Sequence, residues 1–447
     1  MKQKISAIFA VVLFVLTALT FSACSKKTDA EVYFLNFKPE VADVFEDVAK
    51  AYQEETGIAV KVVTAASGTY ESTLKSEIAK KNAPTIFIFN GAVGYSSWKD
   101  YCLDLTDSTL ASKLVSDNYA MRGSDGRIYG LAAVVEGYGI ITNNAILKHY
   151  FSLADRQTSV NSLEEIRNFE SLKIVVEDMT AHKEVLGIDG VFAATSMSAG
   201  EQWRWQSHLA NVPFYYEFLS GTGSLSPTQI GLEAKNVEFL YNQNFRNLFD
   251  LYLNNSTTAP TLLGSKSTAD AMAEFALGKA AMVQNGNWSW AQIDGVDGNV
   301  VEEDDLGMLP LYTGIPGEES QGICIGTENY LAVNRNVSEE KQKAALDFLE
   351  WLYTSKTGKD YVINKLEFIA PYTSFTETEK PDDPLARAVD TWMTRDDIEN
   401  IPWVFEAFPS DNFKNEFGSA LLEYAQGSKT WDETTTTVTD SWKKERS

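Results

Sequence analysis

Tryptophans gather in three short stretches of the chain, and their rings are the groups best suited to hold a ligand. Trp203 and Trp205 lie in EQWRWQ, Trp288 and Trp290 lie in NGNWSW, and Trp403 lies in IPWVFEAF. A flat ring stacks on the apolar CH face of a sugar, while carboxylate and amide side chains bond the sugar hydroxyls. A tryptophan is equally often a core anchor. Because residues two apart on a helix point roughly 200° apart, we expect one ring of each Trp-x-Trp pair in the core and the other at a site.

The sequence lacks the motifs of common enzymes and metal sites. It has no Gly-x-Gly-x-x-Gly or phosphate-binding loop, no Gly-x-Ser-x-Gly elbow and no His-Glu-x-x-His motif. His149, His182 and His208 have no metal-ligand spacing. We therefore expect no catalytic residue, metal or cofactor. Cys102 and Cys324 are the cysteines outside the N-terminal segment, and we expect a free, buried pair, with a disulfide as the alternative.

The chain is strongly acidic. Its 62 acidic and 38 basic residues give a net charge of −24, which repels nucleic acid phosphates and anionic membrane surfaces. A nucleic-acid role is therefore disfavoured, and an uncharged or cationic ligand is favoured. The 447 residues suffice for two domains of ordinary size.

The N-terminus has the pattern of an export signal. The basic MKQK precedes an apolar run of 17 residues, and residues 21–24, FSAC, resemble a bacterial lipobox. We predict a signal peptide over 1–23, a lipidated Cys24, and a polar tether over 24–30 that anchors an extracytoplasmic protein to the cell membrane. Ordinary cleavage with an incidental cysteine is the alternative.

Strand and helix patterns alternate at the start of the mature chain. Residues 32–37, 58–65 and 85–90 read as strands, and residues 41–54 and 69–80 read as helices. This alternation predicts a parallel sheet covered by helices, with ligands bound beyond the carboxyl ends of the strands. The side chains expected at that edge include Asn36, Phe37, Tyr70 and Asn90.

Residues 128–143 predict two further strands, and their glycines flank Glu136 and Tyr138, which suggests close backbone approach with two side chains presented. Strand character returns over 306–333, so one lobe is left and re-entered, and a cleft between lobes suits closure on a ligand. The predicted helices of the remaining chain span 162–176, 201–209, 228–252, 267–277, 339–353, 384–394 and 411–424. The polar tail around 434–437 is too short for a domain.

The run FALGKAAMVQNGNW resembles the signature of the extracellular solute-binding proteins that feed carbohydrate ABC transporters, the maltose- and multiple-sugar-binding-like family 1. Residues 131–143, residues 341–358 and the opening YFLNFKPE are similar to other segments of that family, and the resemblance spans nearly all of residues 30–425. It implies an α/β, two-lobed, periplasmic-binding-protein-like fold of type II, with a hinge of several crossing segments and an interlobe cleft. It also implies binding without catalysis.

The resemblance also implies roles for single residues. Trp288 matches the family's stacking tryptophan, and Glu136 matches a ligand-facing acid. Glu201 and Trp203 match a glutamate and an aromatic of the second lobe more loosely, and Trp403 falls where a late aromatic lines the cleft. The expected ligand-binding residues are Asn36, Phe37, Tyr70, Asn90, Glu136, Tyr138, Glu201, Trp203, Trp288 and Trp403.

The expected lobes divide the chain into 31–142 and 309–363 for the first, and 143–308 and 364–447 for the second. The expected partners are a neutral sugar or oligosaccharide and the permease subunits of an ABC importer, with the receptor a monomer. A longer insert over 148–197 means that the ligand need not be maltose. The alternatives are an exported glycoside-active enzyme, since 62 acidic residues make a chance carboxylate pair common, and a protein of the same fold for a peptide or iron complex.

Overall fold

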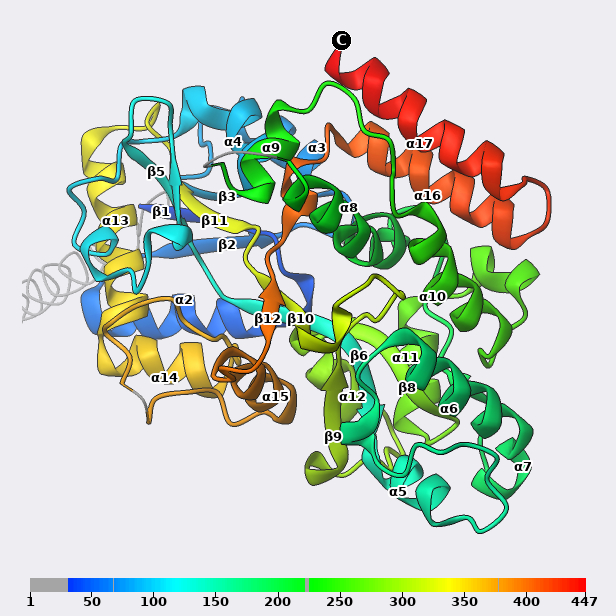
Figure 1. Ribbon diagram of the computed structural model, residues 1–447. Coiled ribbons are helices and arrows are strands. Elements are labelled where there is room, and N and C mark those ends of the chain that lie inside the picture. The colour runs from blue at the N-terminus through cyan, green and yellow to red at the C-terminus, as the bar shows by residue number, and fades with distance from the viewer. Residues whose placement is uncertain (1–30, 67, 222–224, 377) are drawn as a thin grey trace, which may run out of the picture.

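Two sheets, each with its own helices, make up the computed structural model, which describes residues 31–447 without 67, 222–224 and 377 (Figure 1). The predicted signal peptide and Cys24 lie outside the described residues. Among the helices of the described part, none is both long and apolar enough to cross a membrane.

The first sheet follows the predicted alternation of strands and helices. Its strand order is β2-β1-β3-β11-β5-β4, and β1 pairs in parallel with β2 and β3. Strand β11 enters from late in the chain and pairs antiparallel with β3 and β5. The strands are β1 (Val32–Asn36), β2 (Val60–Thr64), β3 (Ile86–Asn90), β4 (Ala120–Arg122), β5 (Ile128–Ala132) and β11 (Asn329–Val333).

The helices of this lobe pack their apolar faces on the sheet. Helix α2 buries Phe45, Val48 and Tyr52 at helical spacing and ends at Gly57, whose φ of 77° suits a glycine. The helices are α2 (Ala42–Thr56), α3 (Tyr70–Ile78), α4 (Gly91–Trp98), α13 (Glu339–Thr354) and α14 (Lys356–Asn364).

The second sheet is built around β6, whose residues are all buried. Its order is β12-β10-β6-β8-β7, and β9 also pairs with β6. Gly139 of β6 lies so close to the Leu309 carbonyl that a Cβ would come within 2.3 Å of the oxygen, which explains the glycine beside Tyr138. The strands are β6 (Glu136–Asn143), β7 (Gly190–Phe192), β8 (Ala280–Gly286), β9 (Leu306–Leu309), β10 (Gln321–Gly326) and β12 (Glu399–Ile401).

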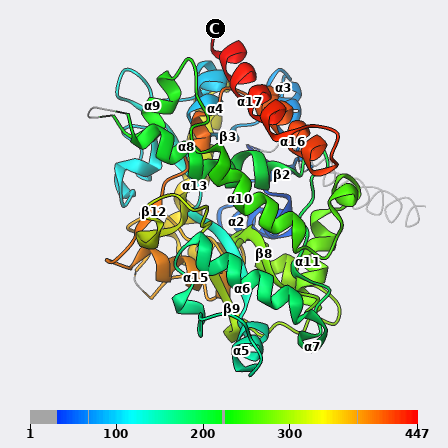
Figure 2. The ribbon, with the colours of Figure 1, turned by 45° about the vertical axis from the view of Figure 1, so that its right-hand side comes forward.

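The remaining helices belong to the second lobe, where α5, α6, α11 and α15 contact the sheet. Helices α16 and α17 lie side by side at the outer edge of the lobe in both views (Figures 1 and 2). The helices are α5 (Asn144–Ser152), α6 (Phe169–Ala181), α7 (Lys183–Leu186), α8 (Ala210–Leu219), α9 (Pro227–Glu233), α10 (Asn242–Asn254), α11 (Thr268–Ala276), α12 (Trp290–Asp294), α15 (Pro384–Met393), α16 (Asp411–Ala425) and α17 (Trp431–Arg446).

Three helix predictions for the second lobe are wrong in their bounds. The helix predicted at 162–176 begins only at Phe169, because Asn168 and Ser171 form a capping box there. The helix predicted at 228–252 is divided into α9 and α10. The helix predicted at 201–209 is instead a π-helical turn, Arg204–Leu209, that continues into α8. The polar tail is part of α17, which starts with a capping box at Thr430.

Each lobe has a separate buried core. Cys102 belongs to the core of the first lobe and Cys324 to the core of the second, and both are free and buried, as expected. The chain passes between the two sheets from β5 to β6 and again from β10 to β11. These short crossings bring residues 133–136 and 326–329 to the boundary between the lobes.

Candidate ligand-binding site

The NGNW turn after β8 fixes the position of Trp288. The Ser289 hydroxyl donates to the Gly286 carbonyl at 2.7 Å, and the Asn287 side chain accepts from the Gly137 N–H at 3.0 Å. The Trp288 ring folds back over Gly286 so closely that a Cβ there would lie 2.2 Å from the ring. The glycine of the motif is therefore required by the ring, and the ring has one orientation.

The structure confirms that one tryptophan of each Trp-x-Trp pair lies in a core. Trp205 is 1% exposed and Trp290 is 7% exposed, and each belongs to a core. Trp203 and Trp288 are partly exposed, and their ring centroids lie 5.9 Å apart. One ring of each pair is thus held in the core, and the other two meet.

These two rings belong to a larger group, here called the aromatic cluster. Tyr138, at the centre, lies 6.4 Å from Trp288, 5.5 Å from Trp403 and 4.2 Å from His208 between ring centroids. Trp403 stands at 88° to Trp288. The cluster consists of Tyr138, Trp203, His208, Trp288, Trp403 and Phe405.

His208 reaches the cluster because of the π-helical turn. Its ring stacks on Phe405 with centroids 5.0 Å apart, and its Nδ1 lies 3.2 Å from the Trp203 carbonyl oxygen. Pro213 follows in α8 and has no N–H to continue the regular ladder, which accounts for the wide turn before it. Burial lowers the pKa of His208 to about 3, so the ring is neutral at physiological pH. The cluster therefore offers aromatic faces without a histidine charge.

Trp203 and Glu201 have further partners within the second lobe. The Arg204 guanidinium lies 3.8 Å from the centre of the Trp203 ring, on one of its faces. The Glu201 carboxylate accepts from the Thr268 N–H at 2.9 Å, at the start of α11. Glu201 therefore caps a helix, a contact that also fixes the segment carrying Trp203.

The first-lobe residues predicted from strand ends divide into two kinds. Asn36 is fully buried and bonds the Lys38 backbone, and the Tyr70 hydroxyl accepts from the Ile88 N–H at 2.7 Å, so both brace the sheet edge. Phe37 and Asn90 remain partly exposed. Phe37 packs edge-on against Tyr70 with centroids 5.1 Å apart.

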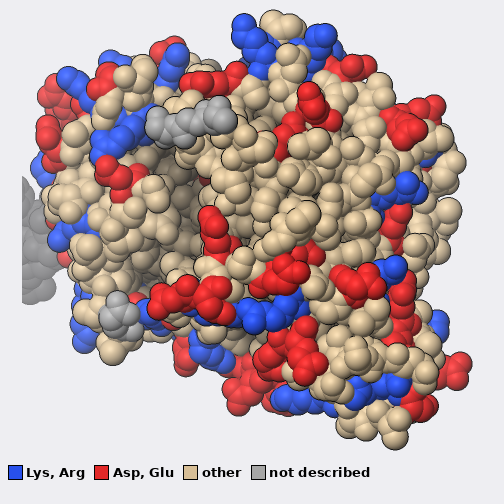
Figure 3. Space-filling model, viewed as in Figure 1, with Lys and Arg blue, Asp and Glu red and all other residues tan. Residues whose placement is uncertain are grey.

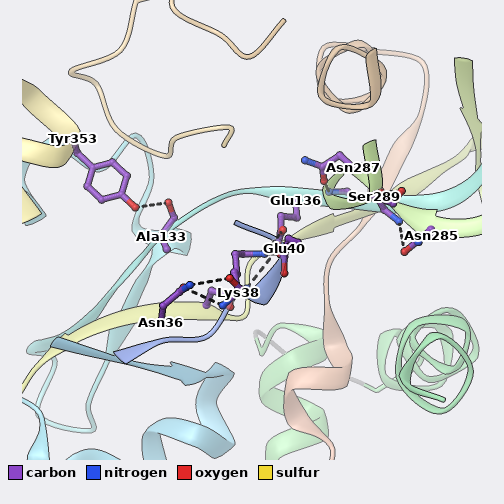
Figure 4. Close-up of polar contacts among 12 residues, drawn as sticks. Asn36, Lys38, Glu40, Ala133, Glu136, Asn285, Asn287, Ser289 and Tyr353 are labelled. Carbon is purple, nitrogen blue, oxygen red and sulfur yellow. Dashed lines mark hydrogen bonds and ion pairs between the residues drawn. The ribbon is translucent and has the colours of Figure 1, made fainter. Parts of the chain in front are cut away.

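Glu136 is engaged by an ion pair between the lobes. Lys38 Nζ, just after β1, lies 2.6 Å from the Glu136 Oε1, at the start of β6 (Figure 4). Asn329 Nδ2 donates to the other oxygen at 3.4 Å. Both side chains of the pair are over nine-tenths buried. The neighbouring carboxylates of Glu136 and Glu40 raise the pKa of Lys38 although burial lowers it, so the ammonium stays charged.

The lobes also touch beside the aromatic cluster. The Gly91 N–H donates to the Glu328 carbonyl at 3.0 Å, and a Cβ on Gly91 would lie 2.8 Å from the Cβ of Glu406. Elsewhere along the boundary, a Cβ on Gly68 would lie 3.4 Å from the Gly200 Cα. Gly91 has a φ of 58°, which suits glycine as well. The lobes are thus in contact along this boundary.

Several buried polar atoms at this boundary have no hydrogen-bond partner among the described residues. Buried polar groups are nearly always paired, so unpaired atoms at one boundary are candidate contacts for a ligand. Trp403, for example, is only 4% exposed. The unpaired atoms here are Trp288 Nε1, Trp403 Nε1, Asn90 Oδ1, Thr327 Oγ1 and Asn329 Oδ1.

Sequence reasoning missed five residues at this boundary: Lys38, His208, Glu328, Phe405 and Glu406. Lys38 lies one residue beyond the end of the strand predicted over 32–37 and was within reach of the same topological argument. The place of His208 in the site could not be reached by that argument, because the direction of its side chain depends on the π-helical turn. Glu328 and Glu406 are single acids in a chain with 62 acidic residues, and only the fold brings them together. Groups of His, Cys, Asp and Glu arranged to hold a metal ion do not occur among the described residues.

The sequence profile of bacterial extracellular solute-binding proteins matches residues 47–388, well over half of the chain. The chain belongs to this family. Its members are binding proteins of ABC transporters that act outside the cytoplasm. No curated protein sequence matches it closely enough to add a relative.

Solved structures share the two-lobed fold. A chitin oligosaccharide binding protein superposes with a TM-score of 0.70 at 17% identity, covering 93% of this chain and 98% of that one. The solute-binding protein RafE in complex with raffinose gives 0.69 at 13% identity, covering 93% and 99%. Maltose-bound MalE3 of T. maritima gives 0.64 at 14% identity, covering 92% and 98%. At these identities the similarity establishes the fold, a two-lobed α/β binding-protein architecture.

Proposed function

We propose that this solute-binding protein is the oligosaccharide receptor of an ABC importer. The observation that carries the proposal is the aromatic cluster at the lobe boundary, with unpaired N–H groups on Trp288 and Trp403. Stacked rings would remove the apolar faces of a sugar from water, and the unpaired polar atoms would bond its hydroxyls. The structural neighbours whose names mention chitin oligosaccharide, raffinose and maltose support a sugar ligand.

In this proposal the ligand contacts differ in kind between residues. Trp288 and Trp203, which are partly exposed, supply ring faces, and the buried Trp403 and Tyr138 pack beside them. Phe37 and Asn90, also partly exposed, contribute from the first lobe. Asn36, Tyr70, Glu136 and Glu201 belong to the same region, and their present bonds indicate that they position the site. A sugar would favour the closed arrangement of the lobes by binding it more tightly than the open one.

We further propose that Cys24 carries the lipid anchor and that the closed receptor delivers sugar to the permease as a monomer. The FSAC sequence supports the anchor. Replacement of Cys24 by Ser should release the protein from the membrane fraction and abolish labelling by a palmitate analogue. Persistent labelling of the Cys24→Ser protein would contradict this assignment.

A thermal-shift screen across di- to tetrasaccharides, followed by calorimetric titration, tests the sugar proposal. A ligand that binds only the native state raises its stability by mass action, by about 2.7 kcal/mol at a hundredfold excess over Kd. Trp288→Ala should lose most of the affinity, while Trp351→Ala, a matched change distant from the boundary, should retain it. Absence of a shift with every saccharide would refute the proposal.

One observation favours the alternative of a glycoside-active enzyme enough to require a test. Burial raises the pKa of Glu328 to about 7 and raises that of Glu406, and a raised carboxyl pKa is what a general acid needs. Incubation of each ligand with the protein, followed by chromatography, separates the two functions. Recovery of intact ligand supports the receptor, and release of product supports the enzyme.

A further inference from the structure

Arg204 is a buried cation without an ion pair. It is 2% exposed, and although burial lowers its pKa to about 10, the guanidinium stays charged at neutral pH. No carboxylate in the described part of the chain forms an ion pair with it, and its Nε has no hydrogen-bond partner there. Acids are not scarce, since the chain has 62 and they lie on both lobes in Figure 3. A buried charge is costly unless it is paired, so this position of Arg204 calls for a reason.

The contacts of the Arg204 guanidinium fix its position. Its Nη1 donates to the Thr268 hydroxyl at 3.0 Å, at the start of α11. The Glu201 carboxylate accepts from the N–H of the same threonine at 2.9 Å, and its negative charge raises the pKa of Arg204 against the effect of burial. The remaining contact is with Trp203, whose ring centre lies 3.8 Å from the guanidinium, well within the range of a cation–π interaction.

The Trp203 ring has few other restraints. No hydrogen bond from its indole N–H occurs in the described part of the chain. His208 and Trp288 meet the ring at tilted angles of 54° and 53°, so Arg204 is the group that lies over its face. The tryptophans whose indole N–H does donate to a protein acceptor are Trp98, Trp351, Trp392, Trp431 and Trp442.

The two partly exposed rings of the aromatic cluster are therefore held by different means. The Trp288 ring folds over the backbone of Gly286, whereas the Trp203 ring lies against the side chain of Arg204. Because Arg204 covers one face of the Trp203 ring, a sugar that stacks on this ring uses the other face. A ring that is held in one plane before the sugar arrives loses less freedom on binding, which raises the affinity.

We propose that Arg204 is a positioning residue for the sugar, which holds the plane of the Trp203 ring and leaves one face of it for stacking. This inference rests on the proposed sugar-binding function. Arg204 acts through Trp203 and does not itself touch the sugar. The π-helical turn that directs His208 into the aromatic cluster also begins at Arg204, so one local feature arranges both rings.

Titrations with maltose, raffinose and chitotetraose test the role of Arg204. Arg204→Met keeps an unbranched side chain and removes the charge, and it should lower the affinity about three- to tenfold, as expected when one more side chain is ordered on binding. In the Trp203→Leu protein the same change should alter the affinity less than about twofold, because the ring through which Arg204 acts is absent. The matched control is Arg395→Met, which should leave the affinity unchanged, since its guanidinium lies 4.6 Å from the centre of the Trp392 ring, outside the aromatic cluster.

A spectroscopic measurement separates positioning from general support of the fold. In protein labelled with 5-fluorotryptophan, the fluorine resonance of Trp203 is assigned by its loss in Trp203→Leu. This resonance should shift in Arg204→Met, because a charge has left the face of the ring, while the resonance of Trp392 should stay in place. If thermal unfolding shows that Arg204→Met is not folded, Thr268→Val takes its place. It releases the guanidinium from the hydroxyl and should shift the same resonance and weaken binding.

Each outcome decides between the proposals. Unchanged affinity in the folded variant, an equal loss with and without Trp203, or an unmoved Trp203 resonance refutes this inference and leaves the receptor proposal standing. Absence of binding by all three sugars overturns the inference, and if the wider saccharide screen is negative as well, the receptor proposal is refuted with it.

Discussion

The buried ion pair between Lys38 and Glu136 gives a stability prediction that can be worked from the structure. At 2.6 Å, two unit charges attract by about 6 kcal/mol at an effective dielectric constant of about 20. Desolvation cancels much of that attraction, because both side chains are over nine-tenths buried. Removal of one partner leaves the other charge buried alone, so Lys38→Met and Glu136→Gln should each reduce the free energy of unfolding by about 3–5 kcal/mol.

The double variant separates the interaction energy between Lys38 and Glu136 from the energies of their contacts with other residues. When both charges are absent, no buried charge is left alone, so the double variant should be more stable than the sum of the single effects predicts, by about 3 kcal/mol. Urea unfolding, followed by circular dichroism at constant pH, measures all four proteins. The slope against urea concentration should stay unchanged, which identifies a change in stability alone.

An exposed pair of the same length provides the matched control. Lys343 lies 2.6 Å from Asp347 on the surface of α13, with side chains 75% and 43% exposed. The cycle of Lys343→Met and Asp347→Asn should give a coupling below about 0.5 kcal/mol. Single effects at Lys38 and Glu136 that simply add, within about 0.5 kcal/mol, would refute the argument that burial couples them.

Three further predictions concern the same boundary. Trp290→Ala should lower the free energy of unfolding by about 3–5 kcal/mol, because the Trp290 ring fills a core. Trp288→Ala should lower it less and should remove most of the sugar affinity. Urea unfolding and calorimetric titration measure both variants, and the reverse pattern would contradict the assignment. Gly286→Ala should weaken sugar binding without unfolding the protein, because the new methyl group displaces the Trp288 ring; a crystal structure with an unmoved ring would contradict it. Burial raises the pKa of Glu328 to about 7, so the folded protein holds the proton on the Glu328 carboxyl more tightly than the unfolded chain does. The free energy of unfolding should therefore fall as the pH rises from about 4.5 to 7, by up to about 3 kcal/mol. Glu328→Gln should flatten this part of the profile, and an unchanged slope in the variant would exclude Glu328 as its cause.

The first lobe could be predicted well from the sequence. Its strands and helices alternate regularly, so the pattern of apolar residues determined the elements, the parallel pairing and the edge at which Asn36 and Asn90 lie. The Trp-x-Trp argument succeeded for a similar reason, because the angular spacing of residues two apart is a local property of the backbone.

The second lobe was harder because tertiary packing overrides local pattern there. Residues 201–209 themselves do not mark the π-helical turn, for which Pro213 beyond them is the local signal, and the turn decides that His208 joins the aromatic cluster. The pairing of Lys38 with Glu136 joins residues 98 apart, and Glu328 and Glu406 are brought together through Gly91. Such contacts depend on how the two sheets are joined, which apolar periodicity does not encode.

The aromatic cluster also gives the molecule an optical signal of its own. The ring centroid of Trp288 lies 5.9 Å from that of Trp203 and 6.5 Å from that of Trp403. At these distances the electronic transitions of the rings can couple. Their fixed, tilted rings should produce a strong near-ultraviolet circular dichroism pattern. Entry of a ligand or separation of the lobes would alter that pattern. The arrival of a solute should therefore be visible without any attached dye.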